Sequence, residues 1–180
     1  TPGLGGEVLT KMGGTVVNMP AGEIFTALQT GAIDATEWIG PYNDLALGLH
    51  KAAKYYYTPG WQEPSVLFEL DVNLKAWDTL PADLKAIVRA AARDVNGDML
   101  DDYNAKNMEA LEQLKADGVD VRRLPDEVLA RLKEVAAEVV DASAAADPAA
   151  TKVWEHQKAY LKRLYDYAEL NEKDIYNIRG

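Results

Sequence analysis

The chain has two regions that differ in the pattern of their hydrophobic residues. Up to about residue 80, short hydrophobic runs alternate with glycine and proline, which is typical of short strands and helices joined by tight turns. Beyond residue 80, hydrophobic residues recur at steps of three and four among Ala, Glu, Asp and Lys, the pattern of amphipathic helices. We therefore predict an α/β region over residues 1–80 and a helical region over residues 81–180.

The first region is predicted to contain a series of short elements, most of them ended by glycine or proline. We expect helices at residues 3–12, 20–30 and 42–50, and strands at residues 15–19, 32–39, 54–57 and 65–73. A strand, a helix and a strand at this spacing indicate a parallel βαβ unit, because parallel strands need a long crossover connection. The fold class predicted from this region is α/β.

The second region is predicted to begin with one very long helix. Hydrophobic residues keep the helical spacing from Pro81 to Asp117, which corresponds to roughly 55 Å at about 1.5 Å per residue. Such a helix is longer than a domain of this size is wide, so a partner chain or another part of the protein must cover its far end. A short strand at residues 119–124 and helices at residues 125–141 and 148–170 complete the prediction.

Composition narrows the possible functions. The chain has 180 residues, enough for a sizeable core, and 48% of them are hydrophobic. Its net charge of −10 argues against binding to nucleic acid or to anionic lipid. No hydrophobic run approaches the roughly 20 residues that a membrane span needs, so we expect no direct membrane insertion. The chain has no cysteine, which excludes disulfides and thiolate chemistry.

Signals of catalysis are scarce. The two histidines, His50 and His156, have no predicted Ser or Asp partner for nucleophilic catalysis. The glycine-rich start at residues 3–6 lacks the complete dinucleotide fingerprint. We therefore predict that the protein is not an enzyme, and keep a carboxylate-dependent enzyme as an alternative.

Two loops carry a more informative group of residues. Glu37 stands at the end of a predicted parallel strand, where open α/β sheets place ligands, and Trp38 follows it directly. The second loop repeats an aromatic residue, an amide and a carboxylate before a proline, at Trp61, Gln62, Glu63 and Pro64. Two carboxylates and exposed carbonyls suit a hard cation such as Na⁺ or Ca²⁺. The alternative is an ordinary pair of surface turns, with the tryptophans filling the core.

Longer stretches of the chain resemble a known family. The sequences GTVVNMP at residues 14–20 and EIFTALQTGAIDA at residues 23–35 are similar to the signature of TRAP-transporter solute-binding proteins, the DctP-type periplasmic receptors. The sequences TEWIGPY at residues 36–42 and GWQEP at residues 60–64 look like the branch that binds 2-oxoacids and other monocarboxylates with a metal ion. The resemblance extends over essentially the whole chain.

The resemblance implies a periplasmic-binding-protein-like lobe of a receptor that closes on a small carboxylate, such as pyruvate or lactate, and delivers it to a TRAP membrane permease. It implies that Glu37, the carbonyl of Trp38 and Glu63 hold the metal ion, Na⁺ or Ca²⁺. It also implies that Trp38, Gln62 and Glu63 contact the carboxylate ligand.

The resemblance further implies a homodimer formed through the long helix, which would explain the length of that helix. The chain resembles only the C-terminal half of such receptors, and it begins at Thr1 without an initiator methionine, so we expect it to be a fragment. The first lobe, a metal-binding amide and the arginine that binds the substrate carboxylate are then expected elsewhere. The alternative for this chain alone is a helical dimerisation module with no ligand binding of its own.

Overall fold

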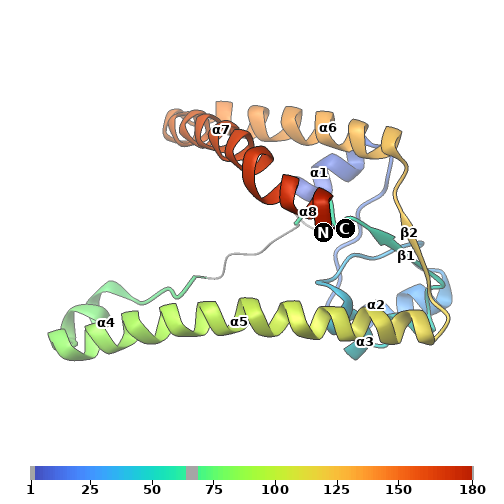
Figure 1. Cartoon of the computed structure of the whole chain (residues 1–180), viewed down its shortest axis with the longest axis horizontal. Helices are drawn as coiled ribbons and strands as arrows, with labels where there is room; N and C mark the ends of the chain where they lie inside the picture. The colour runs from blue at the N-terminus through green and yellow to red at the C-terminus, as the bar shows by residue number, and fades with distance from the viewer. Residues whose placement is uncertain (1–2, 64–68, 180) are drawn as a thin grey trace. The chain divides into compact units, whose positions relative to one another are not determined.

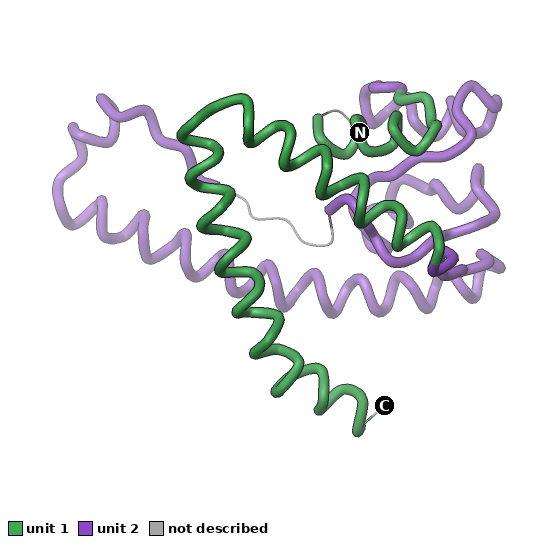
Figure 2. Tube along the Cα trace, turned by 90° about the horizontal axis from the view of Figure 1, so that it is seen from above, with its two compact units in different colours: residues 1–16, 127–180 green, residues 17–126 purple. Residues whose placement is uncertain are grey.

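The computed structural model describes residues 3–63 and 69–179, and its main elements are labelled in Figure 1. The chain forms two compact units, coloured separately in Figure 2. Unit 1 consists of residues 1–16 and 127–180, and unit 2 of residues 17–126. These units follow contacts between residues, whereas the boundary predicted at residue 80 follows composition, and that boundary stays a prediction.

Among its described residues, unit 2 holds a small parallel sheet and five helical elements. Strands β1 (Tyr55–Thr58) and β2 (Asp120–Arg123) pair in parallel, with Tyr55 opposite Asp120 and Thr58 opposite Arg123. The helical elements of the unit are α2 (Ala21–Thr30), α3 (Pro41–Ala46), the 3-10 turn η1 (Leu49–Lys51), α4 (Leu74–Thr79) and α5 (Ala82–Ala116). The parallel pair and its helical crossover confirm the predicted α/β class.

The strands of this pair differ in part from those that the sequence predicted. The strand expected at residues 54–57 is β1, and the strand expected at residues 119–124 is β2. The predictions for residues 15–19 and 32–39 are wrong, because both segments are described and neither forms a strand. Of the strand expected at residues 65–73, residues 69–73 form none and residues 65–68 lie outside the described residues. A β-branched run favours extended backbone, but a strand also needs a neighbour to pair with.

Helix α5 confirms the predicted long helix. It has 35 residues and so extends about 52 Å. It ends at Ala116 with Asp117 as its C-cap, because Gly118 adopts a φ of 86°, which is rare for residues with a side chain. Helix α3 packs against α5, and the buried residues of α5, Ala110 and Leu114, lie in its last two turns. Helix α4 lies at the N-terminal end of α5 (Figure 1). Lys85 and Arg89 of α5 lie over the ring of Trp77 on α4.

Unit 1 is helical in the residues that the structure describes. It contains α1 (Leu4–Lys11), α6 (Asp126–Ala145), α7 (Pro148–Ala168), the π-helical turn η2 (Glu169–Lys173) and α8 (Asp174–Arg179). Helix α7 begins where Asp147 accepts hydrogen bonds from the backbone N–H groups of Ala149 and Ala150, so Asp147 is an N-cap and Pro148 occupies the first turn.

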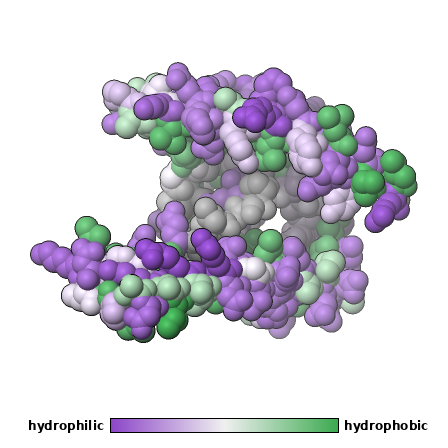
Figure 3. Space-filling view, turned by 60° about the vertical axis from the view of Figure 1, so that its left-hand side comes forward, coloured by the Kyte–Doolittle hydropathy of each residue, from purple (hydrophilic) through white to green (hydrophobic). Residues whose placement is uncertain are grey.

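The buried face of α6 has the helical spacing that the sequence predicts. Its residues Leu132, Val135 and Val139 are buried, and Val135 has no exposed surface at all. By contrast, many large hydrophobic side chains elsewhere are exposed, and Figure 3 shows them as green patches among hydrophilic residues on the face that it draws. Within residues 3–63 and 69–179, none of the helices combines the length and the hydropathy that crossing a membrane requires.

Candidate functional site

The residues predicted to bind metal and ligand lie on two segments of unit 2. The first segment, residues 32–40, joins α2 to α3. Helix α2 ends at Gly31 with a φ of 74°, and the backbone then runs without regular structure to Gly40. On this segment Glu37 is exposed and Trp38 is half-buried. Glu37 thus lies at the protein surface, and its binding to a metal ion stays a prediction.

The second segment follows the carboxyl end of β1. Strand β1 ends at Thr58, and residues 59–63 continue as a loop. Trp61 and Gln62 are half-buried in this loop, whereas Glu63 is exposed. Both predicted carboxylates are therefore exposed side chains on irregular segments, and their direct approach to one ion stays a prediction.

A buried aspartate connects the first segment to strand β1. Asp44 on α3 is only 8% exposed. Its Oδ1 atom accepts a hydrogen bond from the backbone N–H of Ile39 at 3.4 Å, and its Oδ2 atom accepts one from the hydroxyl of Tyr56 at 2.6 Å. Because Tyr56 is the second residue of β1, this one carboxylate connects the segment of Glu37 and Trp38 to the strand that leads to Gln62 and Glu63.

The surroundings of Asp44 change its acidity. Burial raises the pKa of Asp44 above its ordinary value, and the hydrogen bonds from Tyr56, Ile39 and Gly40 oppose that rise. Burial also raises the pKa of Tyr56, and the hydrogen bond and charge of Asp44 raise it further. Tyr56 therefore stays a neutral donor to the carboxylate at physiological pH.

Helix α5 fixes the start of α3. The backbone N–H of Tyr42 donates a hydrogen bond to Oδ1 of Asn107 at 3.0 Å, and the rings of Tyr42 and Tyr103 meet edge to face at 6.1 Å. Gly40 lies so close that a Cβ atom there would be 3.3 Å from Oδ1 of Asn107. The glycine in the sequence EWIGP thus allows the chain to approach α5 closely.

Sequence reasoning missed three of these residues: Asp44, Tyr56 and Asn107. In the run Tyr55–Tyr57, only alternation along β1 distinguishes the half-buried middle tyrosine from its two exposed neighbours. Asp44 is separated from Glu37 by a turn, and Asn107 lies far from both in the sequence. No local spacing relates Asp44, Tyr56 and Asn107 to one another, so the sequence alone offered little sign of their hydrogen bonds.

The predicted donors are all oxygen atoms, which fit a hard cation such as Na⁺ or Ca²⁺. Within the part of the chain that the structure describes, no group of three or more His, Cys, Asp or Glu residues is arranged to hold a metal ion. A site built on Glu37 and Glu63 therefore needs further oxygen ligands, such as the carbonyl of Trp38 or groups from elsewhere in the protein.

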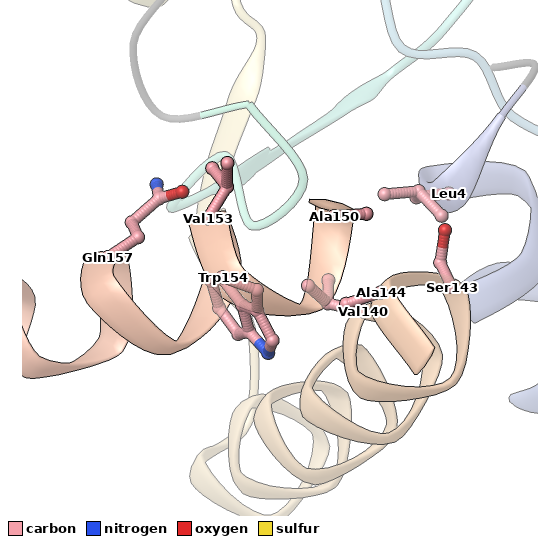
Figure 4. A pocket seen from close by; sticks show the side chains of 8 residues that line it. All are labelled: Leu4, Val140, Ser143, Ala144, Ala150, Val153, Trp154 and Gln157. Carbon is pink, nitrogen blue, oxygen red and sulfur yellow. The ribbon is translucent and has the colours of Figure 1, made fainter. Parts of the chain in front are cut away.

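Unit 1 contains a separate groove that none of the predicted site residues lines. Figure 4 shows its lining side chains, which come from α1, α6 and α7 and are mostly hydrophobic. They include Leu4, Val140 and Trp154, and the groove has a volume of about 300 Å³. Its lining has no carboxylate, so it does not resemble the predicted metal site.

Comparison with known proteins provides independent evidence for the family. The sequence profile of the DctP family, described as bacterial extracellular solute-binding protein, family 7, matches residues 1–147. A curated relative from Nostoc sp. strain PCC 7120, a monocarboxylate 2-oxoacid-binding periplasmic protein, is 40% identical over 176 residues. That match includes 98% of this chain and 48% of the relative, so the chain spans about half the length of that protein.

Two solved structures share the fold. A TRAP periplasmic solute-binding protein from Colwellia psychrerythraea, with bound calcium and pyruvate, has a TM-score of 0.92 and 35% identity; the match covers 98% of this chain and 54% of that one. A TRAP periplasmic solute-binding protein from Pseudoalteromonas atlantica, with bound sodium and pyruvate, has a TM-score of 0.87, 35% identity and the same coverage of both chains. The fold, the sequence motifs and the family profile agree, and the chain therefore belongs to the DctP family of bacterial extracellular solute-binding proteins.

Proposed function

We propose that the protein to which this chain belongs is the periplasmic receptor of a TRAP transporter. It binds a small 2-oxoacid or related monocarboxylate together with Na⁺ or Ca²⁺ and delivers the carboxylate to the membrane permease. The observation that carries this proposal is the likeness to two structures, one with bound calcium and pyruvate and the other with bound sodium and pyruvate. The 40% identity to a 2-oxoacid-binding relative supports the same class of ligand.

The roles of the site residues follow from their chemistry. Glu37, Glu63 and the carbonyl of Trp38 supply oxygen ligands to the ion. Gln62 offers amide donors and acceptors to the carboxylate ligand, which Trp38 and Glu63 also contact. The cation offsets the repulsion between the ligand carboxylate and the two glutamates, since an anion otherwise meets a chain of net charge −10. Binding and release leave the ligand chemically unchanged, so the protein is a receptor and not an enzyme.

The proposal assigns separate tasks to the two regions of the sequence. Residues 1–80 supply the ligand- and metal-binding loops, and residues 81–180 bridge the lobes and form a homodimer. The specific observation that favours dimerisation is the exposed hydrophobic surface on the N-terminal half of α5, where Leu84 is 43%, Ile87 61% and Val95 62% exposed. Burying such side chains against a second copy is favourable by about 25 cal/mol per Å².

The receptor proposal is tested by isothermal titration of pyruvate into the complete protein, with Ca²⁺ or Na⁺ in the buffer. We expect saturable one-to-one binding that requires one of the two ions. Absence of heat with both ions present would indicate that the ligand belongs to another class of carboxylate. Consumption of pyruvate during the titration would instead support the enzyme alternative.

Sedimentation velocity of the 180-residue chain tests the dimerisation alternative. A dimer of the chain that fails to bind Ca²⁺ or pyruvate would favour a dimerisation module for this part of the protein. A monomer at micromolar concentration would contradict dimerisation through α5.

A further inference from the structure

The buried carboxylate of Asp44 has a specific geometric relation to the predicted metal ligand Trp38. The N–H of Ile39, which donates to Asp44, belongs to the same peptide group as the carbonyl of Trp38. That peptide bond is trans, because the one cis bond recorded among the described residues joins Thr58 to Pro59. In a planar trans peptide the N–H and C=O bonds point in opposite directions. Holding the N–H toward Asp44 therefore directs the Trp38 carbonyl away from it.

We infer that Asp44 and Tyr56 are positioning residues, which orient the Trp38 carbonyl toward the metal ion. The inference rests on the proposed function, since it assumes that this carbonyl is a ligand. The two carboxylate oxygens of Asp44 have different partners. Oδ1 accepts a hydrogen bond from the Ile39 N–H, with the nitrogen at 3.4 Å, and Oδ2 accepts one from the Tyr56 hydroxyl, with the oxygen at 2.6 Å. Strand β1, through Tyr56, thus holds the side chain of Asp44 in place, and Asp44 in turn sets the orientation of the peptide group between Trp38 and Ile39.

The Asp44 carboxylate does more than orient the peptide group between Trp38 and Ile39. A carboxylate that accepts from a peptide N–H polarises the peptide and increases the negative charge on its carbonyl oxygen, since consecutive hydrogen bonds strengthen one another in a low dielectric. A more negative carbonyl binds a cation more tightly. Asp44 is 8% exposed, and its hydrogen bonds from Tyr56, Ile39 and Gly40 offset part of the free-energy cost of burying a carboxylate.

The decisive variant is Tyr56→Phe in the complete protein, because it removes one hydroxyl and keeps the ring. We expect the affinity for Ca²⁺, measured by titration of the metal alone, to fall about tenfold, as substitutions behind a metal ligand commonly do. The matched control is Tyr55→Phe on the same strand. Tyr55 is 45% exposed, and its ring keeps its contacts with Arg122 and Lys54 when only the hydroxyl is lost.

Thermal unfolding distinguishes positioning from a merely structural role. If Tyr56 serves only the fold, Tyr56→Phe lowers Tm but leaves the Ca²⁺ affinity of the folded protein unchanged, and the inference is overturned. If neither the unmodified protein nor Tyr55→Phe binds Ca²⁺ or Na⁺, the proposed function itself is wrong. Loss of affinity in Tyr56→Phe alone supports the inference.

A second variant keeps the inference testable if Tyr56→Phe folds poorly. Asp44→Asn retains an oxygen that can accept from the Ile39 N–H but removes the negative charge. We expect the amide proton of Ile39 in the metal-free protein to shift upfield in the NMR spectrum, and the Ca²⁺ affinity to fall less than in Asp44→Ala. An unchanged Ile39 resonance together with unchanged affinity in both Asp44 variants would contradict the inference.

Discussion

Glu37 carries the sharpest prediction at the scale of single residues. We expect Glu37→Gln to weaken Ca²⁺ binding by the complete protein at least tenfold, because the amide is neutral and offers one oxygen where the carboxylate offers two. Pyruvate affinity should fall with it, since the ion offsets the charge of the ligand. Calorimetric titrations with each ligand measure both effects.

The matched control for this substitution is Glu23→Gln, an exposed glutamate in the first turn of α2 in the same unit. Its effect on both affinities should be negligible. Full affinity in Glu37→Gln would remove Glu37 from the site while leaving the family assignment intact.

Asp44 makes stability depend on pH in a defined direction. Because burial raises the pKa of Asp44 above its ordinary value of 3.8, the folded protein holds the proton more tightly than the unfolded chain. The stability contributed by this group is therefore full below that ordinary value and is lost as pH rises through the raised pKa. Tyr56 does not titrate in the same range, since burial raises its pKa.

The variant Asp44→Asn removes this dependence. We expect its free energy of unfolding, relative to the unmodified protein, to increase as pH rises from about 4 to 7. Urea unfolding without metal at several pH values measures this difference. A constant difference across the range would contradict the raised pKa.

The residues that the sequence predicts for the site are those with local signals. Glu37, Trp38, Gln62 and Glu63 stand in short motifs beside Gly40 or Pro64, which a reader of the sequence can find. Asp44, Tyr56 and Asn107 could not be found in this way, because their hydrogen bonds join different helices and strands. Local chemistry is visible in a sequence, whereas hydrogen-bond partners depend on the folded chain.

At the scale of elements, α5 has two ends with different energetics. Leu114 is 1% exposed, so Leu114→Ala should lower the free energy of unfolding by about 2–5 kcal/mol through lost contacts and a cavity. Ile87 is 61% exposed, so Ile87→Ala should change it by less than about 0.5 kcal/mol in a monomer. Urea unfolding of the two variants at low protein concentration tests this contrast.

A loss above 1 kcal/mol for Ile87→Ala that grows with protein concentration would instead indicate that the N-terminal half of α5 is covered in a dimer. A loss below 1 kcal/mol for Leu114→Ala would contradict the placement of the core at the C-terminal end of the helix.

Helices were predicted better than strands for a physical reason. A helix forms its hydrogen bonds within itself, so Pro148, Gly31 and Gly118 mark the start or end of a helix directly. A strand needs a partner that the local sequence does not contain. Residues 15–19 and 32–39 have the composition of strands but remain irregular, whereas Tyr55–Thr58 pairs with a segment that follows α5.

At the scale of the whole molecule, the ion and the carboxylate ligand should bind as one unit. We expect removal of Ca²⁺ with EDTA, in buffer where choline replaces Na⁺, to abolish pyruvate binding by the complete protein. Adding back the physiological ion at about 100 times its dissociation constant should stabilise the folded protein by about 2.7 kcal/mol. Calorimetry and urea unfolding measure the two effects, and pyruvate binding in the absence of both ions would contradict a metal-dependent site.

The parallel pairing of β1 with β2 also has a consequence for the order of folding. Residues 59–119 separate the two strands, so their ladder cannot form until that whole stretch has been synthesised and its ends have met. Helix α5 needs only local contacts and can form within microseconds, whereas pairings between distant segments form late. The hydrogen bond from Tyr56 to Asp44 can form only when β1 has reached its native position. The segment that carries Glu37 and Trp38 should therefore be among the last parts of unit 2 to reach its native conformation, after the long helix that follows it in the sequence.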